Sequence, residues 1–316
     1  MKPRILLIGR NGQVGTELAL LLPRLGELIA LNRQELDLTK PIDIRRTIQE
    51  IRPQWIVNAA AYTAVDRAES DESTARAVNE QAPAVMAEEA KKIGAALVHY
   101  STDYVFDGGK KSPYEETDTP NPINVYGKTK LGGESAVQES GALHLIFRTE
   151  WVYATQGRNF LLTILRLATQ KQELRIVADQ IGSPTTSREI AAATVTAVSQ
   201  LMDRESVLSL ATSGGIYHMT AEGETSWYEF TKAILEEASP ETEHLSWVNA
   251  ATKGMPLTKQ VLPITTAEYP TTARRPAYSV LSTRRLHDRF GVRLPPWRAQ
   301  LRSLFSPDSS EDRHNF

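Results

Sequence analysis

Apolar segments and helix-like segments alternate along the first half of the chain. The apolar segments are short and contain few polar residues; they cover 4–8, 27–31, 55–60, 95–100 and 143–148. Between them, apolar residues recur about every 3.6 positions, which predicts helices over 14–22, 42–51, 74–93 and 125–139. Strands that lack polar alternation are buried on both faces. The pattern therefore predicts a doubly wound α/β fold, a parallel sheet covered by helices on both sides.

The regular alternation of apolar and helix-like segments ends near residue 151. Prolines recur there, and the pattern predicts helices and short strands separated by loops, with helices at 160–169, 187–201 and 227–237 and strands at 174–177 and 216–219. We expect residues 1–150 to form a nucleotide-binding domain. Residues 151–305 should form a smaller mixed α/β substrate-binding domain, with some segments packing back on the first, and 306–316 a polar, flexible tail.

Composition and charge narrow the classes of function. The chain has 316 residues, with Lys+Arg 36 against Asp+Glu 38, a net charge of -2 that removes the electrostatic case for binding nucleic acid. It has no cysteine, which excludes disulfides, thiolate metal sites and cysteine nucleophiles. No apolar run is long enough to span a bilayer, and the apolar start ends at Gly9 and Arg10 without a cleavage-type segment. These features predict a cytoplasmic enzyme without a membrane partner.

A glycine-rich segment follows the first predicted strand. Gly9, Gly12 and Gly15 have the spacing G-x-x-G-x-x-G and open a helix. Such glycines let the backbone approach a pyrophosphate, which binds the free N–H groups at the helix N-terminus. The alternative is a glycine turn that only packs the helix against the strand. The position at the first strand–helix junction favours a dinucleotide site of a Rossmann-like fold, made by Gly9, Asn11, Gly12, Gln13, Val14 and Gly15.

The end of the second predicted strand bears on the choice of cofactor. An acidic residue there would bind the ribose 2′-hydroxyl of NADH, whereas an arginine would accept the 2′-phosphate of NADPH. The strand is followed by Asn32 and Arg33, so we expect NADPH, with NADH tolerated. The alternative is that Arg33 is a solvated loop charge. Asp37 and Leu38 are expected to border the adenine.

Tyr126 and Lys130 form a Tyr-x-x-x-Lys motif on a predicted helix. Residues four apart share a helix face, so both side chains would enter the same cleft. The pKa of a tyrosine is near 10, and a fixed positive charge lowers it, which makes the phenol a better proton donor at neutral pH. The motif also arises by chance on solvated helix faces. The context of the motif favours a catalytic pair, because Thr102 lies just past the fourth predicted strand, about 25 residues earlier.

A Ser/Thr at that strand end, followed by Tyr-x-x-x-Lys, resembles the short-chain dehydrogenase/reductase superfamily. Five further segments resemble the dTDP-4-dehydrorhamnose reductase family, and the similarity runs from about residue 4 to 301; they are 58–66, 101–106, 148–153, 179–185 and 273–276. The resemblance implies reduction of the 4-keto group of dTDP-4-dehydro-L-rhamnose with NADPH or NADH, the last step to dTDP-L-rhamnose.

The resemblance also implies roles for single residues. Tyr126 would donate the proton to the sugar O4, Lys130 would lower its pKa and hold the nicotinamide ribose, and Thr102 would hydrogen-bond the reacting oxygen. Further matches line the cofactor at Ala61, Tyr62, Thr63 and Tyr100, and contact the substrate at Asp103 and Trp151. Arg274 and Arg275 would either meet the substrate diphosphate or remain solvated.

Some members of this family hold Mg²⁺ between the subunits of a homodimer. Glu17 and Glu189 match two of those positions, but the segment expected to supply a third ligand, 282–285, contains two arginines. The sequence therefore argues against a Mg²⁺ site, and we assign no metal ligand. A homodimer stays open.

Two other enzyme functions known on the same fold need residues that this chain lacks. A 4,6-dehydratase needs a second acid where Tyr104 stands, and an epimerase–reductase of the GDP-fucose type needs a cysteine. A nucleotide-sugar 4-epimerase shares the Thr, Tyr and Lys, so only the family motifs argue against it. A non-catalytic NADP-binding regulatory subunit, like that of methionine adenosyltransferase, is the rival from another class. Retention of Thr102, Tyr126 and Lys130 together favours catalysis.

Overall fold

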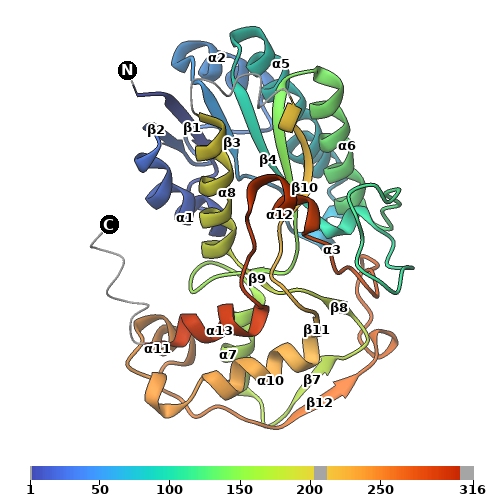
Figure 1. The fold of residues 1–316 in the computed structure, drawn as a ribbon. Coiled ribbons are helices and arrows are strands. Elements are labelled where there is room, and N and C mark those ends of the chain that lie inside the picture. Colours follow the sequence, from blue (N-terminus) through green and yellow to red (C-terminus); the bar gives the residue numbers. More distant parts are fainter. Residues whose placement is uncertain (1, 203–211, 307–316) are drawn as a thin grey trace.

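The computed structural model describes residues 2–202 and 212–306 and is built on a six-stranded parallel sheet (Figure 1). Every neighbouring pair of strands is parallel. The order across the sheet is β10 (Gly215–His218), β5 (Leu143–Thr149), β4 (Ala96–Thr102), β3 (Trp55–Asn58), β1 (Arg4–Ile8) and β2 (Glu27–Leu31). The predicted doubly wound α/β fold is confirmed.

Helices cover both faces of this sheet because its strands send alternate side chains to opposite sides. Ile5 and Leu7 pack with α1 (Gln13–Leu21), α8 (Ser187–Met202) and α12 (Arg284–Phe290). Leu6 and Ile8 face the other way, into a core formed with α2 (Pro41–Ile51), α5 (Ala82–Ile93) and α6 (Val125–Ser140). The continuous apolar runs of the sequence therefore supply two cores at once.

The second half of the chain forms a smaller layer below the sheet and also contributes to it (Figure 1). A third core joins four helices, with Phe230 among its buried side chains; they are α7 (Phe160–Gln170), α10 (Trp227–Glu237), α11 (Ser246–Thr252) and α13 (Trp297–Phe305). Three short strand pairs surround them: β6 (Val152–Tyr153) with β9 (Thr185–Thr186), β7 (Leu174–Val177) with β12 (Val261–Ile264), and β8 (Ile181–Gly182) with β11 (Thr225–Ser226). From this half, β10, α8 and α12 return to the large sheet.

Several boundaries differ from the sequence prediction. The third strand ends at Asn58 and not at residue 60, where the Ala60 amide donates to the Asn58 side chain at 3.2 Å instead of to a neighbouring strand. The predicted helix over 74–93 is α4 (Glu72–Arg76) and α5 with a π-helical turn between them, η2 (Ala77–Gln81). The short helices α3 (Val65–Ala68), α11, α12 and α13 were not predicted. Of the predicted tail, only Ser306 lies within the described residues.

No helix among residues 2–202 and 212–306 has both the length and the apolar character needed to cross a membrane.

A buried ion pair fixes α6 against β5. Arg148 and Glu134 are both about 1% exposed or less, and the guanidinium donates to both carboxylate oxygens, Nε to Oε1 at 2.9 Å and an Nη to Oε2 at 2.6 Å. Such a bidentate ion pair fixes the distance and the rotation of the helix relative to the strand.

We predict that Glu134→Gln lowers the free energy of unfolding by about 3–5 kcal/mol, because it leaves the Arg148 charge buried without its partner. Urea unfolding followed by circular dichroism measures this. Glu229→Gln is the matched control, because Glu229 pairs with Lys232 on the solvent side of α10 and such pairs contribute less than about 1 kcal/mol. Equal losses for the two variants would contradict the prediction.

Candidate active site

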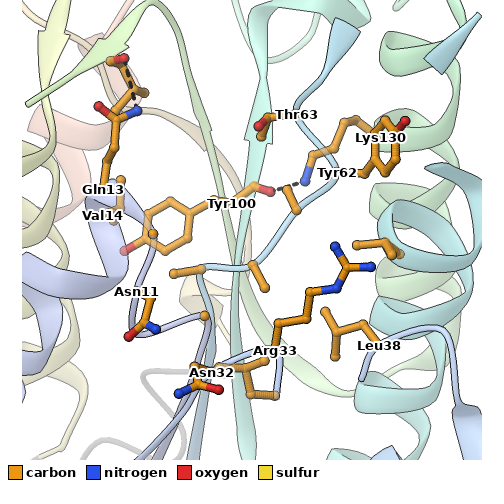
Figure 2. A pocket seen from close by; sticks show the side chains of 18 of the residues that line it. Asn11, Gln13, Val14, Asn32, Arg33, Leu38, Tyr62, Thr63, Tyr100 and Lys130 are labelled. Carbon is orange, nitrogen blue, oxygen red and sulfur yellow. Dashed lines mark hydrogen bonds between the residues drawn. The ribbon is translucent and has the colours of Figure 1, made fainter. Parts of the chain in front are cut away.

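One cavity of about 460 Å³ lies along the carboxyl edge of the sheet and collects most of the predicted cofactor residues. Of the fifteen positions predicted to bind cofactor, those that line it are Gly9, Asn11, Gly12, Gln13, Val14, Arg33, Asp37, Leu38, Ala61, Tyr62, Thr63, Tyr100, Tyr126 and Lys130. Figure 2 shows Asn32, Arg33 and Leu38 toward one end and Lys130 and Thr63 toward the other. The parallel strands bring these residues together, because all their carboxyl ends meet at this edge.

The glycine segment forms the floor of the cavity. Gly9 has a φ of +91°, and a Cβ on Gly15 would lie 2.0 Å from the Gly9 carbonyl oxygen. Gly15 therefore does not line the cavity; it lets α1 approach the turn. Gly12 begins α1 without a side-chain cap, so N–H groups of the first helical turn are free to meet an anion.

The loop after β2 carries one cation into the cavity. Arg33 lines it beside Asn32 and Asp37, and the two carboxylates of the loop are already bound to neighbouring groups. Asp37 accepts from the Thr39 amide at 3.0 Å and the Thr39 hydroxyl at 2.8 Å, and these bonds lower its pKa. Glu35 pairs with Arg10 at 3.1 Å. The loop thus offers a guanidinium to an anionic group.

The start of α6 places Tyr126 and Lys130 on the cavity side. Asn124 caps the helix by accepting the Gly127 amide at 2.7 Å. Gly127 allows close contact, since a Cβ there would lie 2.1 Å from the Tyr104 carbonyl oxygen. Tyr126 and Lys130 follow on one face, as the spacing predicted.

The electrostatics of this pair differ from the expectation. Burial raises the pKa of Tyr126 to about 12, and a hydrogen bond with Thr102 opposes that rise. The ammonium of Lys130 donates to the Tyr100 carbonyl at 2.5 Å (dashed in Figure 2), and burial lowers its pKa to about 8 against the raising effect of Glu134. The lowering of the Tyr126 pKa by Lys130 stays a prediction.

A buried histidine stands behind Lys130. His99 lies 3.4 Å from the Lys130 ammonium and 3.1 Å from the Asn58 amide nitrogen. Burial, then the charge of Lys130, holds the pKa of His99 well below its ordinary value. The imidazole is therefore neutral, and it positions Lys130 without adding a second charge.

Thr102 lies next to Tyr126 but outside the lining of the cavity. Its hydroxyl donates to Asp103 Oδ1 at 2.9 Å and accepts from the Tyr104 amide at 3.2 Å. The short helix η3 (Asp103–Val105) begins at this point, which turns Asp103 inward, where burial raises its pKa to about 7. The hydrogen bond from Thr102 to the reacting substrate oxygen, which the resemblance implied, stays a prediction.

Trp151 is held in a strained backbone conformation. Its φ is +46°, and its ring stacks on Trp227 with centroids 3.4 Å apart and an interplanar angle of 6°. Gly182 makes room, since a Cβ there would lie 2.6 Å from the Trp151 ring. Non-glycine residues with such a φ cluster at functional sites.

The two arginines considered for the diphosphate are placed differently. Arg275 is paired with Asp66, its guanidinium 2.7 Å from the carboxylate. Arg274 is exposed, and its carbonyl accepts from the Asn124 side chain at 2.8 Å. Neither lines the cavity.

Sequence reasoning missed part of the cavity wall. Thr74 and Val78 line it from α4 and η2, and Gly157 and Arg158 from the loop after β6. The spacing of four between Thr74 and Val78 was a readable signal within the predicted helix. The loop after β6 gave no such signal, because a residue far away in the sequence positions it: Asn159 donates to Gln13 Oε1 at 2.9 Å.

Asn79 in the π-helical turn supports the wall from behind. It is about 1% exposed, its Oδ1 accepts the Tyr62 amide at 2.8 Å, and its Nδ2 donates to the Tyr62 carbonyl at 3.0 Å and the Thr129 hydroxyl at 3.2 Å. One side chain therefore links the loop 61–63 to α6. π-turns often lie at functional sites.

The acidic residues considered for a metal lie on neighbouring helices, Glu17 on α1 and Glu189 on α8. Within the described ranges, no three His, Asp or Glu side chains are grouped so as to hold a metal ion. At the third candidate position, Arg284 pairs with Glu115 at 3.2 Å, and Arg285 lies over the Tyr217 ring.

Comparison with known proteins agrees with this architecture. The RmlD substrate binding domain model matches residues 1–309. The dTDP-4-dehydrorhamnose reductase of Burkholderia thailandensis is 50% identical over 93% of this chain and 95% of that protein, and that of Escherichia coli K12 is 41% identical over 96% and 97%. The crystal structure of the Bacillus anthracis dTDP-4-dehydrorhamnose reductase in complex with NADP has a TM-score of 0.83 and 34% identity, covering 96% of this chain and 99% of that one.

We predict that Asn79→Leu lowers the free energy of unfolding by about 1–3 kcal/mol, since it leaves buried backbone groups of Tyr62 without partners. Amide hydrogen exchange should also become faster at Tyr62. Asn121→Ala, at an exposed asparagine, should stay within about 0.5 kcal/mol. Unchanged exchange at Tyr62 would remove Asn79 from this role.

Proposed function

The chain belongs to the RmlD family of dTDP-4-dehydrorhamnose reductases, and we propose that the cavity and the residues around Tyr126 carry out the reaction of that family. The protein is an oxidoreductase that reduces the 4-keto group of dTDP-4-dehydro-L-rhamnose with NADPH, the last step of dTDP-L-rhamnose biosynthesis. The observation that supports the placement of the chemistry is that Tyr126 and Lys130, four residues apart on α6, both line the cavity.

The residues of the cavity fit a nicotinamide dinucleotide. Gly9 and Gly12 line the cavity without side chains, Gly15 lets α1 approach them closely, and the uncapped start of α1 suits the diphosphate. Arg33 would bind a 2′-phosphate, and Ala61, Tyr62 and Thr63 would flank the nucleotide. When bound, the reduced nicotinamide supplies the hydride for the sugar C4.

The remaining steps belong to side chains of this chain. Tyr126 donates its phenolic proton to the sugar O4 as negative charge develops there, and Thr102 holds that oxygen in line. Lys130 binds the nicotinamide ribose, and its charge stabilises the phenolate that Tyr126 becomes. A positive charge beside a phenolate lowers the pKa of the phenol, which brings the proton transfer closer to balance.

Residues 1–150 would hold the cofactor and residues 151–305 the sugar nucleotide. Asp103 and Trp151 would contact the sugar, and Arg274, which is exposed, would reach the diphosphate. The strained backbone of Trp151 and its stacking on Trp227 support a binding role for that side chain. We further propose a cytoplasmic homodimer, which analytical ultracentrifugation and cell fractionation test.

Turnover is the test of the function. Purified protein with enzymatically prepared dTDP-4-dehydro-L-rhamnose should oxidise NADPH stoichiometrically, followed by the loss of nicotinamide absorbance. Binding of NADPH without any oxidation would identify the non-catalytic regulatory subunit instead. Conversion of the sugar without net oxidation would identify an epimerase.

We predict that Tyr126→Phe lowers kcat by about 100-fold or more, because a positioned general acid contributes about 10²–10⁴-fold. The dissociation constant for NADPH should stay close to that of the native protein, as measured by fluorescence titration. Tyr228→Phe, on the outer side of α10, is the matched control and should leave kcat unchanged. Loss of NADPH affinity in proportion to activity would contradict the assigned role.

We predict that Arg33→Ala raises KM for NADPH about tenfold and leaves KM for NADH unchanged, because a hydrogen bond to a charged group contributes about 1.5–3 kcal/mol. Initial rates with the two cofactors measure the difference, and NADH serves as the internal control. A parallel change with both cofactors would show that Arg33 does not bind the 2′-phosphate.

A further inference from the structure

The loop between β6 and α7, residues 154–159, lies in the second half of the chain but contacts the glycine segment of the first. Its Gly157 and Arg158 line the cavity together with Gln13, the first residue of α1. A Cβ on Gly157 would lie 3.7 Å from Gln13 Cγ, so the loop and the start of α1 are in contact. The mechanism above makes no use of this loop.

Asn159 holds the loop against the start of α1. Its side-chain nitrogen donates to the Ala154 carbonyl at 2.8 Å, to Gln13 Oε1 at 2.9 Å and to the Gln156 carbonyl at 3.0 Å. Its Oδ1 accepts the Leu162 amide at 3.1 Å and so caps α7. One half-buried side chain therefore joins the loop, the first turn of α7 and the start of α1.

Arg158 is placed by this arrangement but has no partner of its own. Gly157 on one side of it contacts Gln13, and Asn159 on the other side is hydrogen-bonded to Gln13. The Arg158 side chain is exposed, and within residues 2–202 and 212–306 its guanidinium takes part in no salt bridge or hydrogen bond. A guanidinium that lines a cavity without an acidic partner is available to an anion.

Among the described residues, the cations that line the cavity are Arg33, Lys130 and Arg158. Two of them already have a place in the proposed function, Arg33 at the 2′-phosphate and Lys130 at the nicotinamide ribose. The diphosphate joins the two nucleosides of the cofactor, carries two negative charges and would lie at the start of α1. Figure 2 shows Gln13, at that helix start, apart from both Arg33 and Lys130. The diphosphate therefore has no assigned cation, and Arg158 has no assigned anion.

We propose that Arg158 binds the diphosphate of the dinucleotide cofactor, and that Asn159 positions it by holding the loop against Gln13. The proposal rests on the proposed function and adds to it a side chain from the second half of the chain. A guanidinium suits this task, since it can donate two parallel hydrogen bonds to phosphate oxygens. The amide groups of α1 contribute only a partial positive charge, so a full cation complements them.

Fragments of the cofactor separate the role of Arg158 from that of Arg33. ADP-ribose contains the diphosphate but no 2′-phosphate, whereas 2′-AMP contains a 2′-phosphate but no diphosphate. Arg158→Ala should raise the Kd of ADP-ribose about tenfold, the lower end of what a hydrogen bond to a charged group contributes, and leave the Kd of 2′-AMP unchanged. Arg33→Ala should show the reverse pattern. Isothermal titration calorimetry on the full chain measures each Kd.

The complete cofactors give a second comparison. Arg158→Ala should weaken the binding of NADPH and NADH by the same factor, because both contain the diphosphate. Arg166→Ala is the matched control and should leave every Kd unchanged, since Arg166 is also exposed but lies on α7 outside the cavity lining, where it donates to the Thr163 hydroxyl at 3.4 Å. A native Kd for ADP-ribose in Arg158→Ala, or a loss confined to NADPH, would overturn the proposal.

A double-mutant cycle tests the positioning by Asn159. Asn159→Ser keeps a residue that caps helices well but removes the amide that donates to Gln13. In that background, Arg158→Ala should weaken ADP-ribose binding only about two- to threefold, because the two changes are coupled. The same tenfold loss in both backgrounds would remove Asn159 from the proposal. A purely structural role in capping α7 would lower stability without such coupling.

The proposed function and the role of Arg158 fail in different measurements. Native protein that binds NADPH but never oxidises it would contradict the proposed function, while the Kd of ADP-ribose still reports on Arg158. Native turnover together with an unchanged Kd of ADP-ribose in Arg158→Ala would contradict the role of Arg158 alone.

Discussion

The ion pair between Arg148 and Glu134 is the contact on which the geometry of the active site depends. It joins the middle of α6 to β5 in a buried place, through two hydrogen bonds of 2.9 and 2.6 Å. One turn before Glu134 lies Lys130, and one more turn brings Tyr126, so a rotation of α6 would move both away from Thr102. One residue after Arg148 the strand leads into Thr149, and then into Glu150 and the strained Trp151. A single electrostatic contact thus sets the register between the two sides of the chemistry.

The parallel sheet adds the second constraint. Because its strands all end at one edge, backbone that is distant along the chain supplies one continuous wall, and the loops that follow each strand differ in task. The loop after β1 offers free amide groups, the loop after β2 carries Arg33 into the cavity, and the ends of β4 and β5 bury a hydroxyl and two acids outside its lining. The cavity therefore has a cation toward each end, Arg33 with Asn32 and Leu38 at one and Lys130 with Thr63 at the other.

Burial of the side chains affects the chemistry of the site as much as their residue types do. Tyr126, Lys130, His99 and Asp103 all have pKa values displaced toward their neutral forms, and in each the largest cause is loss of solvent. A site whose groups are mostly neutral responds strongly to one added charge. Binding of a cofactor that carries phosphates, and transfer of one proton to the sugar, would each shift these balances.

Much of the fold and of the candidate site could be predicted from the amino-acid sequence. Apolar runs and 3.6-residue periods predicted the sheet and most of the helices around it. The glycine spacing and Tyr-x-x-x-Lys predicted the cavity residues, because such signals reside within a few neighbouring positions. The short strands of two residues and helices α11, α12 and α13 were missed, since they have few residues for a period. The third core holds α11 and α13, and the first core holds α12.

Only the tertiary structure decided how distant side chains meet. Arg275 pairs with Asp66, Asn79 supports Tyr62, and Glu150 lies near Asp103. None of these pairs is close in sequence, and each depends on strand register and on one rotamer. Local periodicity and motif spacing therefore determined the fold class and the family of this protein. The pairing of its charges was decided by packing, because burial and distance exist only once the chain is folded.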